Sequence, residues 1–332
     1  MSRVAVCGVS GAVGKEVLEC LKDLNIPVTG LSLYASARSA GKKIETPFGE
    51  KTIEEFDVEK AKDHDFIFLC VSGDFSKQYA KDLTEKGAVV IDNSSAFRYD
   101  PKVPLIVPEI NAEDIQGSKL IANPNCTTAI LSVALYPIAQ EFGLEKIIVS
   151  TYQATSGGGQ PAMDELKNQS VNYLEGKEVT CDKFAYPIPF NLIPQIDVFQ
   201  ENDYTKEEMK VTWETRKIFN LPDLKISCTA VRIPTFRAHA ESVTIETIRP
   251  INIQKVRDLL EKAEGVELVD DVENLSYPMP VTATKKFDVE VGRIRKNEVF
   301  GENGLDFFVC GDQLLKGAAL NAVQIMKSII EK

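Results

Sequence analysis

The chain of 332 residues contains no apolar run long enough to cross a membrane. Its longest apolar stretch lies near Ala129 to Ala139 and contains Pro137. The first residues also lack the features of a secretory signal, because only the short run Val4 to Cys7 precedes the first glycine and no small-residue cleavage site follows. We therefore expect a cytoplasmic protein that has no membrane partner.

Metal-ligand spacing is also missing, since there is no CxxC pair and only two histidines are present, His64 and His239. We expect no metal site and a reducing compartment. Most of the thiols lie within apolar patterns, where a free cysteine is usually a small core residue. The seven cysteines are Cys7, Cys20, Cys70, Cys126, Cys181, Cys228 and Cys310.

Positive charge is scarce: 38 Lys and Arg face 49 Asp and Glu, which gives a net charge of −11. Such a balance argues against nucleic acid or an anionic membrane as a partner. Any anionic substrate must therefore be bound by a few placed basic residues. The hydrophobic content of 44% and the length favour two domains with buried cores.

The first half alternates short apolar runs with amphipathic stretches. Val4 to Cys7, Phe66 to Cys70 and Ala88 to Ile91 are near-continuous apolar segments, as buried parallel strands should be. Helical spacing follows in Val13 to Leu24, and Ser76 to Lys86 is a second helix candidate. This alternation predicts an α/β fold with a Rossmann-type doubly wound sheet.

In the second half, apolar and polar residues alternate along the predicted strands. This pattern predicts an antiparallel or mixed sheet with one solvent-exposed (wet) face in a second α+β domain. Examples are Val243 to Glu246 and Phe287 to Val291. Tyr186 to Pro194 is apolar but broken by prolines, so we expect an ordered excursion there. The predicted nucleotide domain covers residues 1–126, and residues 127–311 form the second domain. A final helix, 312–332, would begin at the capping residue Asp312.

A glycine motif follows the first predicted strand and opens a helix. Gly8, Gly11 and Gly14 have the spacing GxxGxxG, a variant of the dinucleotide-binding fingerprint. About one strand later, where an NAD enzyme usually has an acidic residue, the chain has Arg38 and Ser39. A guanidinium and a hydroxyl suit a 2′-phosphate, so the sequence favours NADP. A tight turn without a ligand remains the alternative for the motif, and a solvated basic turn for Arg38.

Cys126 differs from the other cysteines because it lies between a strand and a helix, in Asn123-Pro124-Asn125-Cys126-Thr127. Backbone N–H groups and the helix dipole at this position stabilise a thiolate, and Asn125 adds a donor for an oxyanion. A thiolate enzyme needs an acid–base partner. His239 is the candidate, because His64 lies in an acidic turn, although a structural histidine remains an alternative.

These residues belong to a longer series of motifs, and with them the chain resembles aspartate-β-semialdehyde dehydrogenase from its amino terminus through its last helix. The motifs occur in the family's order: Gly8 to Gly14, Ala35 to Gly41, Ile91 to Arg98, Asn123 to Cys126, Tyr152 to Gly159, Lys206 to Lys210, Arg232 to His239 and Gln313 to Ala319. The resemblance also implies a second domain of the glyceraldehyde-3-phosphate-dehydrogenase-like type and a homodimer.

The implied reaction is the NADPH-dependent reductive dephosphorylation of L-aspartyl-4-phosphate to L-aspartate-4-semialdehyde, in the biosynthesis of lysine, threonine and methionine. By matching position, Cys126 forms the thioester, His239 manages protons and Gln153 positions the acyl centre. Arg232 and Glu207 would bind the carboxylate and ammonium of the substrate. Arg98 and Lys210 would bind phosphate, and Asn125 would also contact the substrate.

The resemblance implies a cofactor site drawn from several motifs. In two of them the family commonly differs, having Thr where this chain has Ser10 and often Asn where it has Gln313. Both changes keep a hydrogen-bonding side chain. The implied cofactor-binding residues are Gly8, Ser10, Gly11, Ala12, Val13, Gly14, Arg38, Ser39, Ser72, Ser156, Gly157 and Gln313.

Two other functions compete with this interpretation. A sister acyl-phosphate reductase, such as N-acetyl-γ-glutamyl-phosphate reductase, would use the same cofactor and thioester chemistry. Glu207 discriminates against it, because an acetylated amine offers no cation to pair with that carboxylate. A non-catalytic NADP-sensing regulator on the same fold would need neither Cys126 nor His239.

Overall fold

The computed structural model describes residues 2–331. The chain divides into two compact units, each of which is described by itself. Unit 1 consists of Met1–Asn125 together with Gly317–Lys332, and unit 2 consists of Cys126–Lys316. The chain therefore first passes from unit 1 to unit 2 between Asn125 and Cys126.

Unit 1 contains a seven-stranded sheet in the order β3-β4-β2-β1-β5-β6-β7, which is parallel except for the antiparallel pair β3 and β4. The strands are β1 Ser2–Cys7, β2 Val28–Ala35, β3 Lys43–Ile44, β4 Lys51–Glu55, β5 Phe66–Leu69, β6 Val89–Asp92 and β7 Leu120–Ala122. The helices are α1 Ala12–Asp23, α2 Val58–Ala61, α3 Gly73–Leu83, α4 Pro108–Asn111, the 3₁₀ turn η1 Ala112–Ile115 and α10 Leu320–Ile330.

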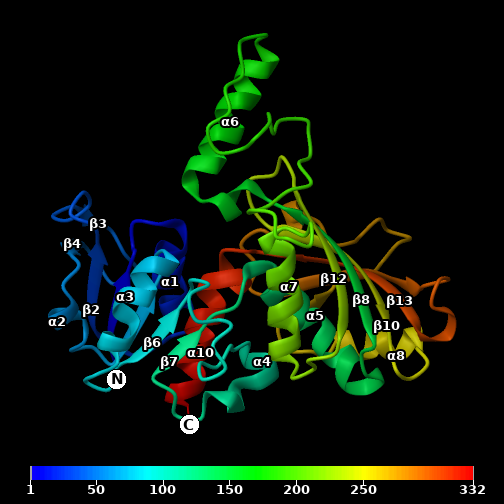
Figure 1. The fold of residues 1–332 in the computed structure, drawn as a ribbon, viewed down its shortest axis with the longest axis horizontal. Helices are drawn as coiled ribbons and strands as arrows, with labels where there is room; N and C mark the ends of the chain where they lie inside the picture. Colours follow the sequence, from blue (N-terminus) through cyan, green and yellow to red (C-terminus); the bar gives the residue numbers. More distant parts are fainter. Residues whose placement is uncertain (1, 332) are drawn as a thin grey trace. The chain divides into compact units, whose positions relative to one another are not determined.

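The central strands of unit 1 are apolar because both of their faces are covered. Every residue of β5 and β6 is buried. Helix α1 buries Gly14, Val17, Leu18, Cys20 and Leu21, and α10 packs against α1, α4 and β6, so the end of the chain lies beside elements from its beginning (Figure 1). The predicted Rossmann-type sheet is confirmed.

Unit 2 contains a mixed six-stranded sheet in the order β11-β12-β13-β10-β8-β9. Helices α5, α7 and α8 pack against it, whereas α6 stands away from it (Figure 1). The strands are β8 Lys146–Gln153, β9 Lys225–Arg232, β10 His239–Glu246, β11 Val266–Leu268, β12 Val289–Lys296 and β13 Gly304–Gly311. The helices and 3₁₀ turns are α5 Cys126–Phe142, η2 Thr155–Gly158, α6 Gln160–Leu174, α7 Lys206–Ile218, α8 Ile253–Leu260, α9 Pro280–Ala283 and η3 Gly301–Asn303.

Three local predictions for the second half were wrong. Phe287 lies outside β12, which begins at Val289. Glu290, expected on a wet face, is fully buried because α9 covers that part of the sheet, and its carboxylate accepts hydrogen bonds from Lys286 and Thr282. The final segment is not one regular helix: the π-helical turn η4 Leu315–Ala319 precedes α10. Asp312 still accepts hydrogen bonds from two backbone N–H groups, as a capping residue does.

No helix within residues 2–331 is long and apolar enough to span a membrane.

Candidate active site

The glycine motif forms a tight turn between β1 and α1. Gly8 has φ +89°, and a Cβ there would lie 2.1 Å from the Cys70 carbonyl oxygen. A Cβ at Gly14 would lie 2.5 Å from the Gly8 carbonyl oxygen, so close packing requires both glycines. Gly11 is exposed, and a Cβ there would meet only the Gly8 carbonyl oxygen, at 3.3 Å. Its lack of a side chain leaves the start of α1 open to a phosphate group.

A cavity of about 290 Å³ opens beside this turn, at the carboxyl ends of β1 and β2. That edge is where doubly wound sheets bind nucleotides. Gly8, Ser10 and Ser72, which the sequence indicated as cofactor-binding residues, line this cavity together with three aromatic side chains that the sequence did not indicate, Tyr34, Phe56 and Phe75. Phe56 and Phe75 stand 4.7 Å apart between ring centroids and offer an apolar surface to a planar base. These three aromatic residues come from separate segments of the chain, so only the folded structure shows that they line one cavity.

Arg38 and Ser39 lie in the turn that follows β2. Ser39 is buried and its N–H bonds the Ser36 carbonyl, whereas the Arg38 side chain is exposed. Among residues 2–331 no ion pair is recorded for the Arg38 guanidinium. It therefore has donors available for an anionic ligand.

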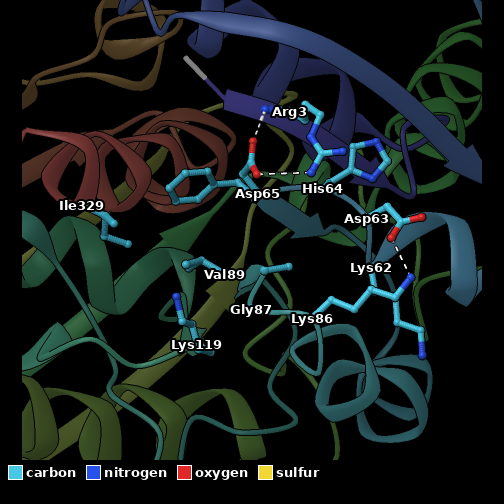
Figure 2. Close-up of a pocket in the computed structure, with 12 residues that line it drawn as sticks. Arg3, Lys62, Asp63, His64, Asp65, Lys86, Gly87, Val89, Lys119 and Ile329 are labelled. Atoms are coloured by element: carbon cyan, nitrogen blue, oxygen red, sulfur yellow. Dashed lines mark hydrogen bonds and ion pairs between the residues drawn. The ribbon is translucent and has the colours of Figure 1, made fainter.

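A larger cavity, of about 490 Å³, lies at the opposite edge of the unit 1 sheet, by the amino ends of β1, β5 and β6. Figure 2 shows that two of its basic side chains, Arg3 and Lys86, already face carboxylates. Arg3 pairs with Asp65, and Lys86 pairs with Asp63 at 2.6 Å. This internal neutralisation and the position away from the glycine turn make it a poor nucleotide site.

Cys126 is the first residue of α5, as the sequence predicted. Its side chain is partly exposed, whereas Cys7, Cys20, Cys228 and Cys310 are buried. Burial raises the pKa of the thiols of Cys7, Cys228 and Cys310, and it raises the pKa of Cys70 to about 12. Those four thiols therefore stay protonated near neutral pH, which leaves Cys126 as the helix-terminal thiol suited to act as a nucleophile.

His239 and Arg232 come together around the η2 turn. His239 is fully buried, and its Nδ1 accepts a hydrogen bond from the Ala154 N–H at 3.1 Å. Among the described residues 2–331, its Nε2 has no hydrogen-bond partner. Arg232 donates through Nη1 to the Ala154 carbonyl. A Cβ on Gly157 would lie 2.9 Å from Arg232 Nη1 and 3.4 Å from His239 Nε2, so only glycine leaves both groups uncovered.

The electrostatics of this pair follow from burial. Burial and the neighbouring Arg232 lower the pKa of His239 from 6.5 to about 3. Burial also lowers the pKa of Arg232, while Glu207 and Cys126 oppose that shift. Arg232 therefore stays cationic near the Cys126 sulfur and favours its thiolate form.

A buried polar chain extends from Gln153 into α7. Gln153 accepts from Thr151 at 3.0 Å and donates to Glu207 at 3.2 Å. Lys210 lies one helical turn after Glu207, and its Nζ is 2.9 Å from the Glu207 carboxylate. Helix α7 begins with a capping box, in which Thr205 and Glu208 exchange hydrogen bonds, and this fixes the position of Glu207.

Comparisons with known proteins agree with this geometry. Residues 3–118 match the family described as "Semialdehyde dehydrogenase, NAD binding domain", and residues 135–316 match "Semialdehyde dehydrogenase, dimerisation domain". The aspartate-semialdehyde dehydrogenase of Synechocystis is 46% identical, over 99% of this chain and 98% of its own. That of Aquifex aeolicus is also 46% identical, with the same shares covered. The chain belongs to the aspartate-semialdehyde dehydrogenase family.

A solved relative supports the same assignment for the whole fold. The crystal structure of aspartate semialdehyde dehydrogenase II from Vibrio cholerae has a TM-score of 0.96 and 41% identity, covering 100% of this chain and 99% of that one. A second structure of that enzyme is described as complexed with ASA. The predicted family is therefore confirmed, and unit 1 of this dehydrogenase is its nicotinamide-dinucleotide-binding domain.

The predicted phosphate-binding residues of the dehydrogenase belong to different units. Arg98, in unit 1, is buried and donates to the Asn123 and Asn93 carbonyls at 2.9 and 2.8 Å. It thus holds the loop that ends at Asn125, which is itself buried. Lys210, in unit 2, is bound between two carboxylates instead of being open to solvent.

Two predicted cofactor residues contact each other within unit 2. Gln313 donates to the Ser156 hydroxyl and accepts from the Ala238 N–H at 2.7 Å. Ser156 and Gly157 both lie in η2, so Gln313 ties that turn to the strand bearing His239. Within residues 2–331 no group of three metal-ligating side chains is found.

Sequence reasoning missed Asp197, whose carboxylate lies 2.8 Å from Lys210 Nζ. It follows the proline-broken segment Tyr186 to Pro194. Ile193 forms a two-way backbone bridge with Arg232. No periodicity or motif marks Asp197, because its position depends on a pairing between distant segments.

Proposed function

We propose that this oxidoreductase is an NADP-dependent aspartate-semialdehyde dehydrogenase that reduces L-aspartyl-4-phosphate through a thioester on Cys126. The buried Glu207 carboxylate, beside Gln153 and Lys210, is the observation that carries the choice of substrate. The Lys210 ammonium beside this carboxylate is shared with Asp197, and the free ammonium of an aspartyl substrate supplies a second cation for Glu207. The relative crystallised with ASA supports the same choice.

The cofactor site favours NADP over NAD. The glycine turn has room for a pyrophosphate at Gly11, and the exposed Arg38 follows the second strand, where no acidic residue is present. Ser10, Ala12 and Val13 would add backbone contacts, and Ser39 and Ser72 side-chain contacts. Bound NADPH would supply the hydride for the reduction.

Cys126 needs no separate base in this proposal. The start of α5 and the Arg232 charge favour the thiolate. Sγ attacks the acyl carbon, a carbon–sulfur bond forms, and the bond from that carbon to the phosphate oxygen breaks, so that phosphate leaves. After reduction of the thioester, the carbon–sulfur bond breaks and its electrons return to Cys126 as thiolate, which releases the aldehyde.

His239 acts as a hydrogen-bond donor in this scheme. The Ala154 N–H occupies Nδ1, so the neutral ring carries its proton on Nε2. Since the pKa of His239 is about 3, the ring is neutral at pH 7. Its Nε2–H can stabilise the oxygen charge of each tetrahedral stage, with Asn125 as a second donor. Gln153, fixed at both ends, would orient the acyl group.

Arg232 and Glu207 would bind the two charges at the amino-acid end of the substrate, whereas Arg98 and Lys210 would bind phosphate. A cavity of about 340 Å³ in unit 2 borders Arg232 and is also lined by Lys183 and Asp197. The planar Arg232 fork matches a carboxylate. The family's dimerisation domain supports a homodimer. We also propose a place in lysine, threonine and methionine biosynthesis, in the cytoplasm, and no nucleic-acid partner.

We expect Arg38→Ala to raise the KM for NADPH by roughly 10–100-fold, because one or two charge-assisted hydrogen bonds are lost. The KM for NADH should change little, since NADH has no 2′-phosphate. Steady-state rates with each cofactor measure both constants. An unchanged KM for NADPH would remove Arg38 from the site.

Arg232→Lys should raise the KM for the semialdehyde by roughly 10–100-fold, because a point charge replaces a bidentate fork. The KM for phosphate in the reverse reaction should stay almost constant. Lys210→Ala should show the opposite pattern, and thus serves as the matched comparison. Equal effects of both substitutions on both constants would indicate one shared anion pocket.

The substrate itself is tested by phosphate-dependent NADP reduction with L-aspartate-4-semialdehyde, run beside N-acetyl-glutamate semialdehyde. We expect a clear preference for the aspartyl compound, because an acetylated amine brings no positive charge to the Glu207 carboxylate. A preference for the acetylated compound would assign the protein to the sister reductases. Activity with neither compound would contradict the proposed function.

A further inference from the structure

Lys210 has two carboxylate partners. Its Nζ lies 2.9 Å from Glu207, on the same helix, and 2.8 Å from Asp197, which belongs to the segment before that helix. The lysine side chain is 13% exposed, so water screens these contacts poorly. Burial alone would lower the pKa of Lys210, but the two carboxylates raise it above its usual value. The Lys210 ammonium therefore stays protonated and pairs with both carboxylates.

Asp197 is held in place from both sides. Four residues earlier, Ile193 exchanges backbone hydrogen bonds with Arg232. One residue later, the Val198 carbonyl accepts from the Lys206 N–H, the first residue of α7. Asp197 itself has φ +69°, a conformation that Asp and Asn tolerate better than other non-glycine residues. Its carboxylate also caps the Val198 N–H at 2.9 Å.

The Asp197 carboxylate changes the charge balance around Lys210 and Glu207. If Glu207 alone held Lys210, that pair would neutralise the carboxylate that must bind the ammonium of the substrate. A second anion draws the lysine charge away from Glu207. The same anion stands beside the cation that phosphate must reach, and therefore repels phosphate.

We propose that Asp197 is a positioning residue that shares the Lys210 ammonium with Glu207, keeps Glu207 available to the substrate ammonium, and competes with phosphate for Lys210. This inference rests on the proposed function, because it uses the assignment of Glu207 and Lys210 to those two groups. In this inference Asp197 sets the ratio between the KM for phosphate and the KM for the semialdehyde. Asp197 contacts none of the reacting atoms, so kcat should depend on it weakly.

The test is Asp197→Asn, which keeps the backbone conformation and the oxygen that caps Val198 but removes the charge. In the reverse reaction we expect the KM for phosphate to fall roughly three- to tenfold, because one repelling charge is gone. The KM for the semialdehyde should rise by a similar factor, because Lys210 then pairs with Glu207 alone. Asp197→Gly, which also tolerates positive φ, should act in the same direction.

The matched control is Asp203→Asn. Asp203 has φ +63° and is exposed in the neighbouring turn, outside the cavity that borders Arg232. This control should leave both constants unchanged. If both KM values of Asp197→Asn equal those of the wild type, or if its KM for phosphate rises, the inference is wrong.

A measurement without turnover separates this inference from the proposed function. Acylation of Lys210 by acetic anhydride, followed by peptide mass mapping with the exposed Lys225 as internal reference, reports how available the amine is. Asp197→Asn should speed acylation, since the pKa of Lys210 falls, and phosphate should protect at lower concentration. An inactive wild type with this labelling pattern would overturn the reaction but not the position of Asp197. Equal labelling and protection in both proteins would overturn the inference.

Discussion

Cys126→Ala should lower turnover by roughly four orders of magnitude or more, because no other group in the site can form the thioester. Of the remaining cysteines, Cys7, Cys70, Cys228 and Cys310 have thiols whose pKa burial raises, so none offers a thiolate in its place. NADPH binding should persist, because the glycine turn belongs to unit 1 and Cys126 to unit 2. Fluorescence titration with NADPH and steady-state assays measure the two quantities.

The matched control is Cys181→Ala, which removes an exposed thiol on a different segment. It should leave both turnover and NADPH binding unchanged. In the wild type, mixing with the semialdehyde and NADP without phosphate should trap an acyl group on Cys126, detectable by intact mass. Turnover near the wild-type rate in Cys126→Ala would show that the reaction is not covalent.

The sequence predicted the features that depend on local pattern. The glycine turn, the strand before it and the helix start at Cys126 all follow from residues adjacent in the chain. Glu207 and Lys210 are three residues apart, so helical spacing alone places them on one face of α7. These features involve short segments whose geometry is largely determined by the residue types within them, so the sequence alone predicts them.

Features that depend on contacts between residues far apart in the chain could not be predicted from the sequence. The alternation of residues along the strand predicted that Glu290 is exposed to solvent, but it cannot show that α9 covers that face of the sheet. Phe56 and Phe75 meet only when β4 and α3 come together beside the glycine turn. Asp197 reaches Lys210 because Ile193 pairs with the strand end at Arg232. In each case a long-range contact decides the environment of the side chain.

The second large effect concerns His239. His239→Asn should lower kcat by roughly 10²–10⁴-fold, because the donor at Nε2 is lost while the shorter amide still offers an oxygen near the Ala154 N–H. His239→Gln places an amide N–H near the former Nε2 position, and it should recover about tenfold over the asparagine variant. Initial rates at saturating substrates measure both variants.

The comparison of the two amides separates hydrogen-bond donation from proton transfer. Neither amide titrates in the working pH range, but only glutamine reaches far enough to replace the donor. If both variants were equally impaired, His239 would have to transfer a proton, and the assignment of its Nε2–H as a donor would be wrong.

The acid stability of the protein gives an independent check on the same histidine. The pKa of His239 falls from 6.5 to about 3 on folding, because burial disfavours the cation. The folded protein therefore binds fewer protons than the unfolded chain between these values, and the contribution of neutral His239 to stability is present above pH 6.5 and lost as the pH falls. At pH 5 the wild type should have lost about 2 kcal/mol more of its unfolding free energy, relative to pH 8, than His239→Asn. Denaturant unfolding at both pH values measures this difference, and parallel losses would mean that His239 becomes charged within the folded protein, where its proton could then take part in the reaction.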